Sequence, residues 1–193
     1  MTDQPALAMI EFSSIAVGTR ALDALLKKAP VTLIRAGSVQ PGKFAVLFAG
    51  EVAAVDESYV EACRVGGSVL IDRVLLPDVH DSVREAVLGE RGDWKHDTLG
   101  IIETPTMAAV IEAADAAVKG ADVSVIEIRL GDGLGGKGLA HFAGALADIE
   151  AAIEIGTARI AHRNQPFCTT IIPRADETML STRATSTRFG EGW

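Results

Sequence analysis

The chain has 193 residues, 48% of them hydrophobic, which is enough to bury one core of ordinary size or two small ones. Its 26 acidic residues outnumber its 18 basic ones, and the net charge of −8 argues against a protein that binds a nucleic-acid backbone. No apolar run reaches the roughly 20 residues needed to cross a membrane, and the N-terminal residues lack the pattern of a secretion signal, so we expect a cytosolic protein.

The first half of the chain predicts six elements in the order β, α, β, β, α, β. Short apolar runs such as 6–12 are typical of buried strands, whereas Ala21, Leu22 and Leu25 follow the spacing of one helix face. The expected elements are strand 6–12, helix 16–28, strands 31–38 and 43–49, helix 51–65 and strand 69–76.

The second half repeats the first. Residues 7–11 are echoed by 99–103 at an offset of 92, and the offset grows only where turns are expected, to 94 at Lys43 and Lys137. The expected elements of this copy are strand 98–104, helix 107–119, strands 123–130 and 137–143, helix 145–159 and strand 167–172.

The repeat predicts an α+β fold with two tandem domains, each a mostly antiparallel, ferredoxin-like β-sheet flanked by helices. We place the first domain at 6–88, a polar linker at 89–97 and the second domain at 98–180. The remaining residues, 181–193, are rich in Ser, Thr and Arg at their start, and we expect a flexible tail there.

A glycine-rich run at 131–136 satisfies the pattern GxGxxG and precedes Lys137. A dinucleotide site needs a helix after the glycines, whereas 138–143 has the pattern of a strand, and no Ser or Thr follows the lysine as a phosphate-binding loop requires. The run instead predicts a tight turn between two strands, in which glycines supply positive φ angles.

No metal centre or catalytic set stands out. The histidines lack metal-ligand spacing, Cys63 and Cys168 form no CxxC motif, and no Ser/His/Asp or Cys/His set can be assembled. Glu11 and Glu103 end the first strand of each copy, which duplication of a structural residue explains better than a pair of catalytic acids. We therefore expect no enzyme, no metal and no cofactor.

The two helix ends at 23–31 and 115–123 share the pattern Asp-Ala-x-x-Lys-x-Ala-x-Val. Together with Pro41-Gly-Lys-Phe, Gly135-Gly-Lys and Ile172-Pro-Arg, in that order, this pattern resembles the shell domain of bacterial microcompartments (BMC) over about residues 6 to 178. Two unpermuted copies in one chain most resemble the PduT-like type of tandem shell protein. The resemblance implies a homotrimer that acts as a pseudohexameric tile among other BMC shell proteins.

The resemblance also implies roles for single positions at the edge of the tile. Lys27 and Lys119 correspond to the lysine through which neighbouring tiles pack, and Arg174 corresponds to an edge arginine. Asp78 stands at the arginine's position in the first copy, so the two kinds of edge differ.

The turn between the second and third strands of each copy corresponds to the pore loop. The expected pore-lining residues are Ser38, Val39 and Gln40 of the first domain and Asp132, Gly133 and Leu134 of the second. In PduT-like proteins a cysteine of the first loop can ligate an iron–sulfur cluster, but Gln40 occupies that position and an amide is a poor cluster ligand. We expect a narrow, polar opening without a cluster.

The leading hypothesis is a structural shell tile that passes small polar metabolites and contacts itself, other shell proteins and encapsulated enzymes, with no role for nucleic acid or membrane. Two alternatives stay open. One is an iron–sulfur electron carrier of the shell, and the other is a trimeric regulatory protein that binds a small ligand.

Overall fold

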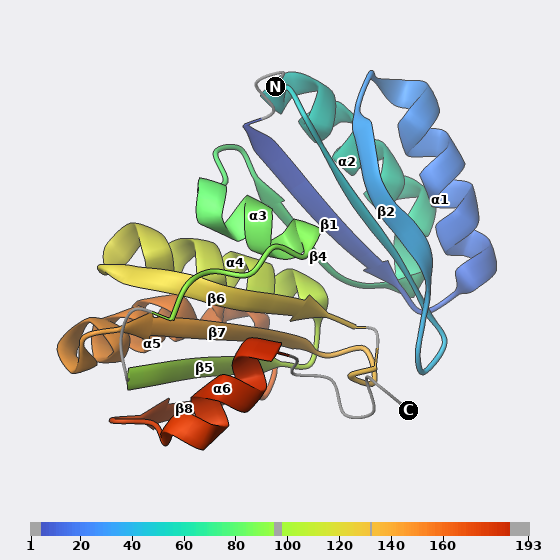
Figure 1. Cartoon of the computed structure of the whole chain (residues 1–193). Helices are drawn as coiled ribbons and strands as arrows, with labels where there is room; N and C mark the ends of the chain where they lie inside the picture. The colour runs from blue at the N-terminus through green and yellow to red at the C-terminus, as the bar shows by residue number, and fades with distance from the viewer. Residues whose placement is uncertain (1–4, 95–97, 132, 186–193) are drawn as a thin grey trace.

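The computed structural model of the chain describes residues 5–94, 98–131 and 133–185 (Figure 1). The first domain consists of β1 (Ala6–Phe12), α1 (Ile15–Lys28), β2 (Thr32–Val39), β3 (Lys43–Gly50), α2 (Val52–Gly66), β4 (Leu70–Leu76) and α3 (Asp81–Leu88). The second consists of β5 (Thr98–Thr104), α4 (Met107–Gly120), β6 (Val123–Leu130), β7 (Gly138–Gly144), α5 (Leu146–Ile160), β8 (Cys168–Ile172) and α6 (Glu177–Thr185). One turn of 3₁₀ helix follows α2 and another follows α5.

Each domain contains a four-stranded antiparallel sheet with the same strand order. The first sheet runs β2-β3-β1-β4 and the second runs β6-β7-β5-β8. The α+β prediction is therefore confirmed, and every strand and helix that the sequence predicts is present with bounds that agree to within one residue. No helix in the described part of the chain is long and apolar enough to cross a membrane.

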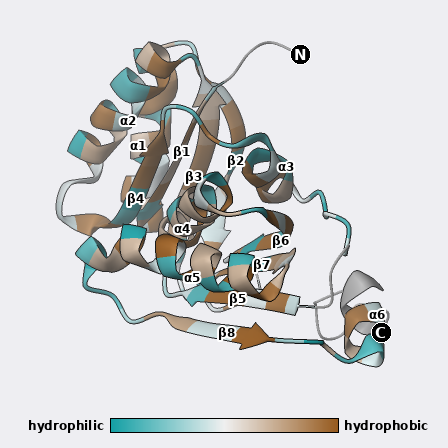
Figure 2. Ribbon diagram, turned by 90° about the vertical axis from the view of Figure 1, so that its left-hand side faces the viewer, coloured by the Kyte–Doolittle hydropathy of each residue, from teal (hydrophilic) through white to brown (hydrophobic). Residues whose placement is uncertain are grey.

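Strand β1 is buried along its whole length because both faces of the first sheet are covered. Ile10 and Phe12 point with Phe48 into a core formed with α1 and α2, whereas Leu7 and Met9 point to the opposite face. This alternation follows from the two-residue period of a strand. Figure 2 shows the strands of both sheets as predominantly hydrophobic.

Helix α4 of the second domain covers that opposite face of the first sheet. It contacts β1 and β4 of the first domain as well as β5, β6 and β7 of its own. Ten of its 14 residues are buried, whereas only Gly18, Ala21 and Leu25 are buried in α1, its counterpart in the first copy. A helix that is buried on most of its circumference belongs between two layers, and α4 lies between the two sheets.

Helix α3 was not expected from the sequence. It begins after His80, whose Nδ1 accepts from the Ser82 N–H at 3.3 Å, and it ends at Gly89 with a left-handed φ of 103°. Its apolar side, formed by Val83, Ala86 and Val87, is buried, and the helix packs against β6 of the second domain. So short a helix depends on that contact for its stability.

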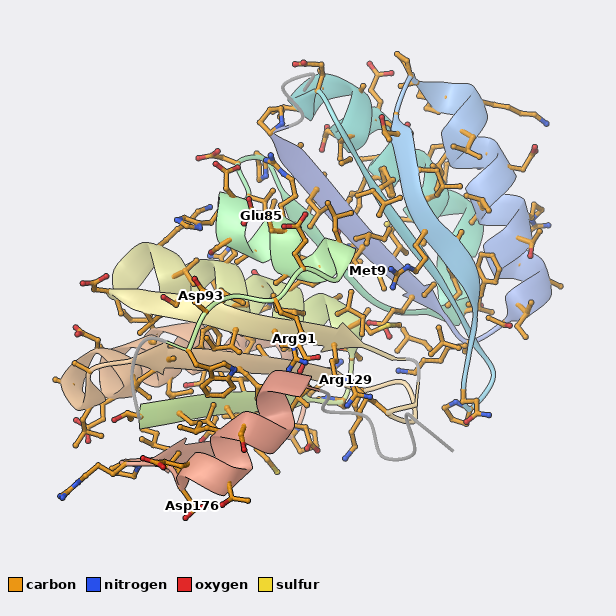
Figure 3. The ribbon with its side chains drawn as sticks, viewed as in Figure 1. Met9, Glu85, Arg91, Asp93, Arg129 and Asp176 are labelled. Atoms are coloured by element: carbon orange, nitrogen blue, oxygen red, sulfur yellow. The ribbon has the colours of Figure 1, made fainter. Side chains whose placement is uncertain are left out.

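The linker predicted at 89–97 follows β6 over its described part. The Gly92 N–H donates to the Ile126 carbonyl at 2.9 Å, and the Arg91 guanidinium lies 3.7 Å from the Glu127 carboxylate (Figure 3). Residues 95–97 lie outside the described residues.

The tail predicted at 181–193 begins inside a helix. The Asp176 carboxylate accepts from the Thr178 and Met179 N–H groups and caps α6, which continues to Thr185. Such caps stabilise a helix start, which explains why polar residues adopt a helix here. Residues 186–193 lie outside the described residues.

A buried charge cluster joins the two domains. The Arg163 guanidinium donates to Asp72 of the first domain and to Glu112 of α4, with an Nε to Oε2 distance of 3.1 Å in the second pair. The three side chains are only 7%, 9% and 8% exposed. Since Arg163 lies between these two buried carboxylates, its removal leaves Asp72 without its ion-pair partner and leaves Glu112 with the exposed Arg159.

We expect the substitution Arg163→Ala to lower the free energy of unfolding by about 3–5 kcal/mol, the usual cost of breaking a buried ion pair. Arg159→Ala is the matched control, because Arg159 also contacts Glu112, at 2.9 Å, but is 60% exposed. Its loss should cost less than about 1 kcal/mol. Urea unfolding followed by circular dichroism compares the two, and equal losses would contradict a domain-joining role for Arg163.

Candidate functional site

The two turns predicted to form the pore loops lie side by side at one end of the molecule, at the lower right of Figure 1. The β2–β3 turn is 40–42 and the β6–β7 turn is 131–137. A Cβ added to Gly136 would lie 2.9 Å from the Gln40 carbonyl oxygen, and one added to Gly131 would lie 2.7 Å from Cγ1 of Val39. The fold therefore brings together two segments that are about 90 residues apart in sequence.

The predicted pore residues of the first turn differ in exposure. Ser38 and Gln40 are exposed, and Val39 is half-buried against the second turn. A cis peptide bond joins Gln40 to Pro41, and the Gly42 N–H closes the turn on the Val39 carbonyl at 2.9 Å.

The second turn is built by glycines in the left-handed region. Gly131, Gly133, Gly135 and Gly136 all have positive φ between 62° and 81°. The turn joins two antiparallel strands, so the strand-turn-strand interpretation of the GxGxxG run is confirmed. Gly133 is exposed and Leu134 is half-buried, whereas Asp132, the third predicted pore residue, lies outside the described residues.

Lys43 fastens the two turns to each other and to the interface between the domains. Its ammonium group donates to the Gly136 carbonyl at 3.1 Å, to the Pro105 carbonyl at 3.3 Å and to the Glu11 carboxylate at 3.2 Å. The side chain is 16% exposed. A lysine that the sequence presented only as a repeat position and a family landmark thus connects both domains.

Glu11 completes this anchor from the end of β1. Its second carboxylate oxygen accepts from the Ala108 N–H at 2.9 Å, in the first turn of α4, and the side chain is 0% exposed. A carboxylate at a helix N-terminus is favoured both by the free N–H groups and by the helix dipole. Burial nevertheless raises the pKa of this carboxyl above its ordinary value of 4.5, against the opposing effects of the Ala108 N–H and of Lys43.

The predicted edge lysines are not in equivalent surroundings. Lys27 forms an exposed pair with Asp23 at 2.7 Å, with its side chain 73% exposed. Lys119 forms the same pair with Asp115 at 2.8 Å and also donates to the Asp78 carbonyl of the first domain. Lys119 is therefore partly engaged in the contact between the two domains of one chain.

Arg174 is exposed and lies in the turn after β8 with a φ of 50°. The third predicted edge residue is thus accessible.

A cavity of about 480 Å³ lies next to the first turn, between the two domains. Ser38 and Arg35 supply polar groups at its wall, and Met9, Met107 and Leu130 supply apolar ones. No group of three or more His, Cys, Asp or Glu side chains able to hold a metal ion occurs among the described residues.

The chain thus contains two copies of one four-stranded sheet, packed head to tail with their turns at one end. The BMC domain family matches residues 6–79 and again residues 98–175. The chain belongs to this family, and it is a bacterial microcompartment shell protein with two tandem BMC domains.

Individual relatives agree with this assignment. The chain is 34% identical to the bacterial microcompartment shell protein PduT of Citrobacter freundii over 90% of this chain and 95% of that protein. A microcompartment protein from Desulfitobacterium hafniense DCB has a similar structure, with a TM-score of 0.81, 35% identity and coverage of 93% of this chain and 99% of the other.

More distant relatives share the fold. The carboxysome assembly protein CcmO of Synechocystis is 26% identical over 94% of this chain and 65% of that protein. The fused permuted hexameric shell protein of the RMM microcompartment has a TM-score of 0.59 at 21% identity, covering 82% of this chain and 83% of the other.

Glu11 offers a test of the anchor. Glu11→Ala should lower the free energy of unfolding by about 2–3 kcal/mol, because it leaves the buried Ala108 N–H without its acceptor and Lys43 without its carboxylate partner. Glu11→Gln should cost less, because it keeps an oxygen for the N–H and removes a carboxylate whose raised pKa shows that burial disfavours its charge. Urea unfolding at fixed protein concentration compares the variants.

The same experiment has a pH dependence of known sign. Because the pKa of Glu11 is raised, the folded protein binds a proton there more tightly than the unfolded chain. As the pH falls from 7 toward 4.5, the free energy of unfolding of the wild type should rise relative to that of Glu11→Gln. Below pH 4.5 the difference between the two proteins should stay constant. A difference that does not change with pH would contradict this account.

Proposed function

We propose that this protein is a structural tile of a microcompartment shell in the bacterial cytoplasm rather than an enzyme. Three copies form a pseudohexameric ring, the ring packs laterally against other shell proteins, and small polar metabolites cross at its centre. Each chain contributes two of the six domains around the ring.

The observation that carries this proposal is the head-to-tail packing of the two domains. Helix α4 of the second domain covers one face of the first sheet. In the described part of the chain, no equivalent helix covers the corresponding face of the second sheet. A heterologous contact of this kind propagates until rotation closes it into a ring. The 34% identity to PduT over nearly the whole of both chains supports a tandem tile of the same kind.

The paired turns supply the pore in this proposal. Ser38 and Gln40 are exposed beside the glycine turn that includes Gly133, and threefold symmetry would bring three such pairs to the axis. Hydroxyl, amide and backbone groups can hydrogen-bond a small polar solute without holding it tightly. Val39 and Leu134 supply apolar contacts at the same rim.

Lateral packing would use Lys27, Lys119 and Arg174. The exposed Arg174 marks the edge of the second domain, where Asp78 stands in the first. Because the two edges carry opposite charges at this position, neighbouring tiles meet through two chemically different contacts.

The cavity beside Met9 and Arg35 favours one other function, that of a trimeric protein that binds a small ligand. Such a protein would form rings that do not associate further. An iron–sulfur carrier would need a thiolate near the pore, and Cys63 and Cys168 both lie outside the two turns.

Solution mass and negative-stain electron microscopy test the proposal together. We expect the wild type to have the mass of a trimer and to form hexagonal sheets at modest salt, with sheets lost as salt rises, because exposed charge contacts are screened. Arg174→Ala should keep the trimer mass and form fewer sheets. Arg64→Ala is the control, since Arg64 is an exposed arginine paired within α2 to Glu61.

If the protein has the mass of a monomer at all concentrations, the proposed tile is wrong. A trimer that never forms sheets, alone or with other shell proteins, and that binds a metabolite tightly would favour the ligand-binding function. A brown preparation with bound iron would favour the electron carrier.

A further inference from the structure

A β-bulge in β2 decides which face of the first sheet the Arg35 side chain belongs to. Leu33 lies opposite Phe48 of β3. A regular strand would then place Arg35 opposite Val46, in the core shared with α1 and α2. The register shifts between Leu33 and Arg35, and Arg35 instead lies opposite Leu47. Because Leu47 belongs to the core on the α4 side, the bulge turns Arg35 to the face that α4 covers.

The cavity of about 480 Å³ between the two domains lies on this face. Arg35, Leu47 and Met9 are neighbours across β2, β3 and β1 and form part of its floor. Met107 at the start of α4 and Leu130 at the end of β6 line it from the second domain. All of these residues come from one chain, so the cavity exists without a second copy.

Small residues make room for the cavity. Gly37 and Ala45 lie opposite each other in its wall, and a Cβ added to Gly37 would meet no atom within 4 Å. The corresponding pair in the second copy is Arg129 and Leu139, which also lie opposite each other. The first copy thus lacks the larger side chains with which the second copy occupies the equivalent space.

The cavity wall carries a cation. Among the described residues that line the cavity, Arg35 is the one charged side chain, and within 5–94, 98–131 and 133–185 it makes no hydrogen bond or ion pair. Its counterpart in the second copy is an acid, Glu127, which lies 3.7 Å from the Arg91 guanidinium. The repeat therefore has an available guanidinium beside a cavity in one copy and an acid that is already engaged in the other.

A guanidinium beside an apolar floor suits an anion that has one charge and an apolar body. The planar guanidinium matches a carboxylate, to which it can donate two parallel hydrogen bonds. Met9 and Leu47 offer apolar contacts to a hydrocarbon chain next to that pair. The volume lies near the lower end of the range of ligand pockets, about 300–1,000 Å³, and so favours a small molecule.

A second hollow, of about 160 Å³, shares Arg35 with the cavity but is less suited to an anion. Glu90, Glu127 and Arg129 line it, so its acids outnumber its bases apart from Arg35. A dianion reaching from the cavity toward this hollow would be repelled. The charges around Arg35 therefore favour a monoanion on the cavity side.

We propose that the cavity between the domains binds a short-chain monocarboxylate, with Arg35 pairing with the carboxylate and Met9, Leu47 and Met107 packing against the hydrocarbon chain. The inference goes beyond the proposed tile and does not require the ring. Ser38 lines the same cavity and is exposed at the first turn, so the bound molecule lies beside the candidate pore.

A titration with sodium butyrate, followed by ligand-observed NMR, tests the inference. We expect a dissociation constant of about 1 mM, because a ligand of so few atoms makes few contacts. Butyramide has the same shape without the charge and should bind about fivefold more weakly, since it loses the charge-assisted hydrogen bonds. No detectable butyrate binding, or equal affinities for the two compounds, would overturn the inference.

The variant Arg35→Gln removes the charge and little of the volume. It should weaken butyrate binding about fivefold or more and leave butyramide binding unchanged. Arg64→Gln is the matched control, because Arg64 is an exposed arginine paired with Glu61 within α2, and it should bind butyrate as the wild type does. If Arg35→Gln binds butyrate as tightly as Arg64→Gln, Arg35 does not hold the carboxylate.

The variant Ala45→Leu fills the cavity with the residue that the second copy has at the equivalent position, Leu139. It should weaken the binding of butyrate and butyramide alike, because it removes space and keeps Arg35. Circular dichroism and urea unfolding establish that the variant is folded, and normal butyrate binding by the folded variant would place the site elsewhere. If it does not fold, the comparison of Arg35→Gln with Arg64→Gln still decides the question.

The cavity and the tile fail separately. Since one chain supplies every lining residue, a monomeric wild type should still bind butyrate, although the proposed ring would then be wrong. A trimer that forms sheets but does not bind butyrate would leave the tile intact and overturn the role of the cavity.

Discussion

The carboxylate of Glu11 at the start of α4 is the contact on which the arrangement of the two domains depends. It satisfies a helix N–H that would otherwise be buried without an acceptor, and it pairs with Lys43, which also donates to the Gly136 carbonyl of the second turn. The geometry of the paired turns therefore follows from the way one domain receives a helix of the other. A change at this contact alters the interface and the candidate pore together.

The two copies of the repeat differ in how much of their surface is buried. Helix α4 lies between two sheets and is buried on both sides, whereas α1 has the same length and buries one side only. The sheets differ in the same way, since the first is covered on both faces and the second exposes Thr169 and Thr170. Duplication supplied two similar units, and their different neighbours explain the differences in composition between them.

Much of this could be predicted from the sequence, because the repeat gives two independent examples of every element. Strand and helix bounds were correct to within one residue, and the glycine turn was distinguished from a nucleotide loop by the strand that follows it. Helix α3 was missed, because Val83, Ala86 and Val87 make a recognisable face only against β6 of the other domain. The Arg163 cluster could not be predicted from the sequence either, because Asp72 lies 91 residues from Arg163 and no local pattern connects them. Glu11 was understood as a structural residue, but its role at α4 depends on packing between domains.

The linker between the domains has a consequence for how the two kinds of contact respond to concentration. Residues 89–94 run along β6 and keep the two domains of one chain within reach of each other, so their contact is intramolecular. Short tethers correspond to effective concentrations in the millimolar range, and that contact forms however dilute the protein is. The open face of the second sheet and the outer side of α1 have no tether. Dilution therefore separates chains while leaving each pair of domains intact, so the two-domain chain is the smallest unit that a shell could gain or lose.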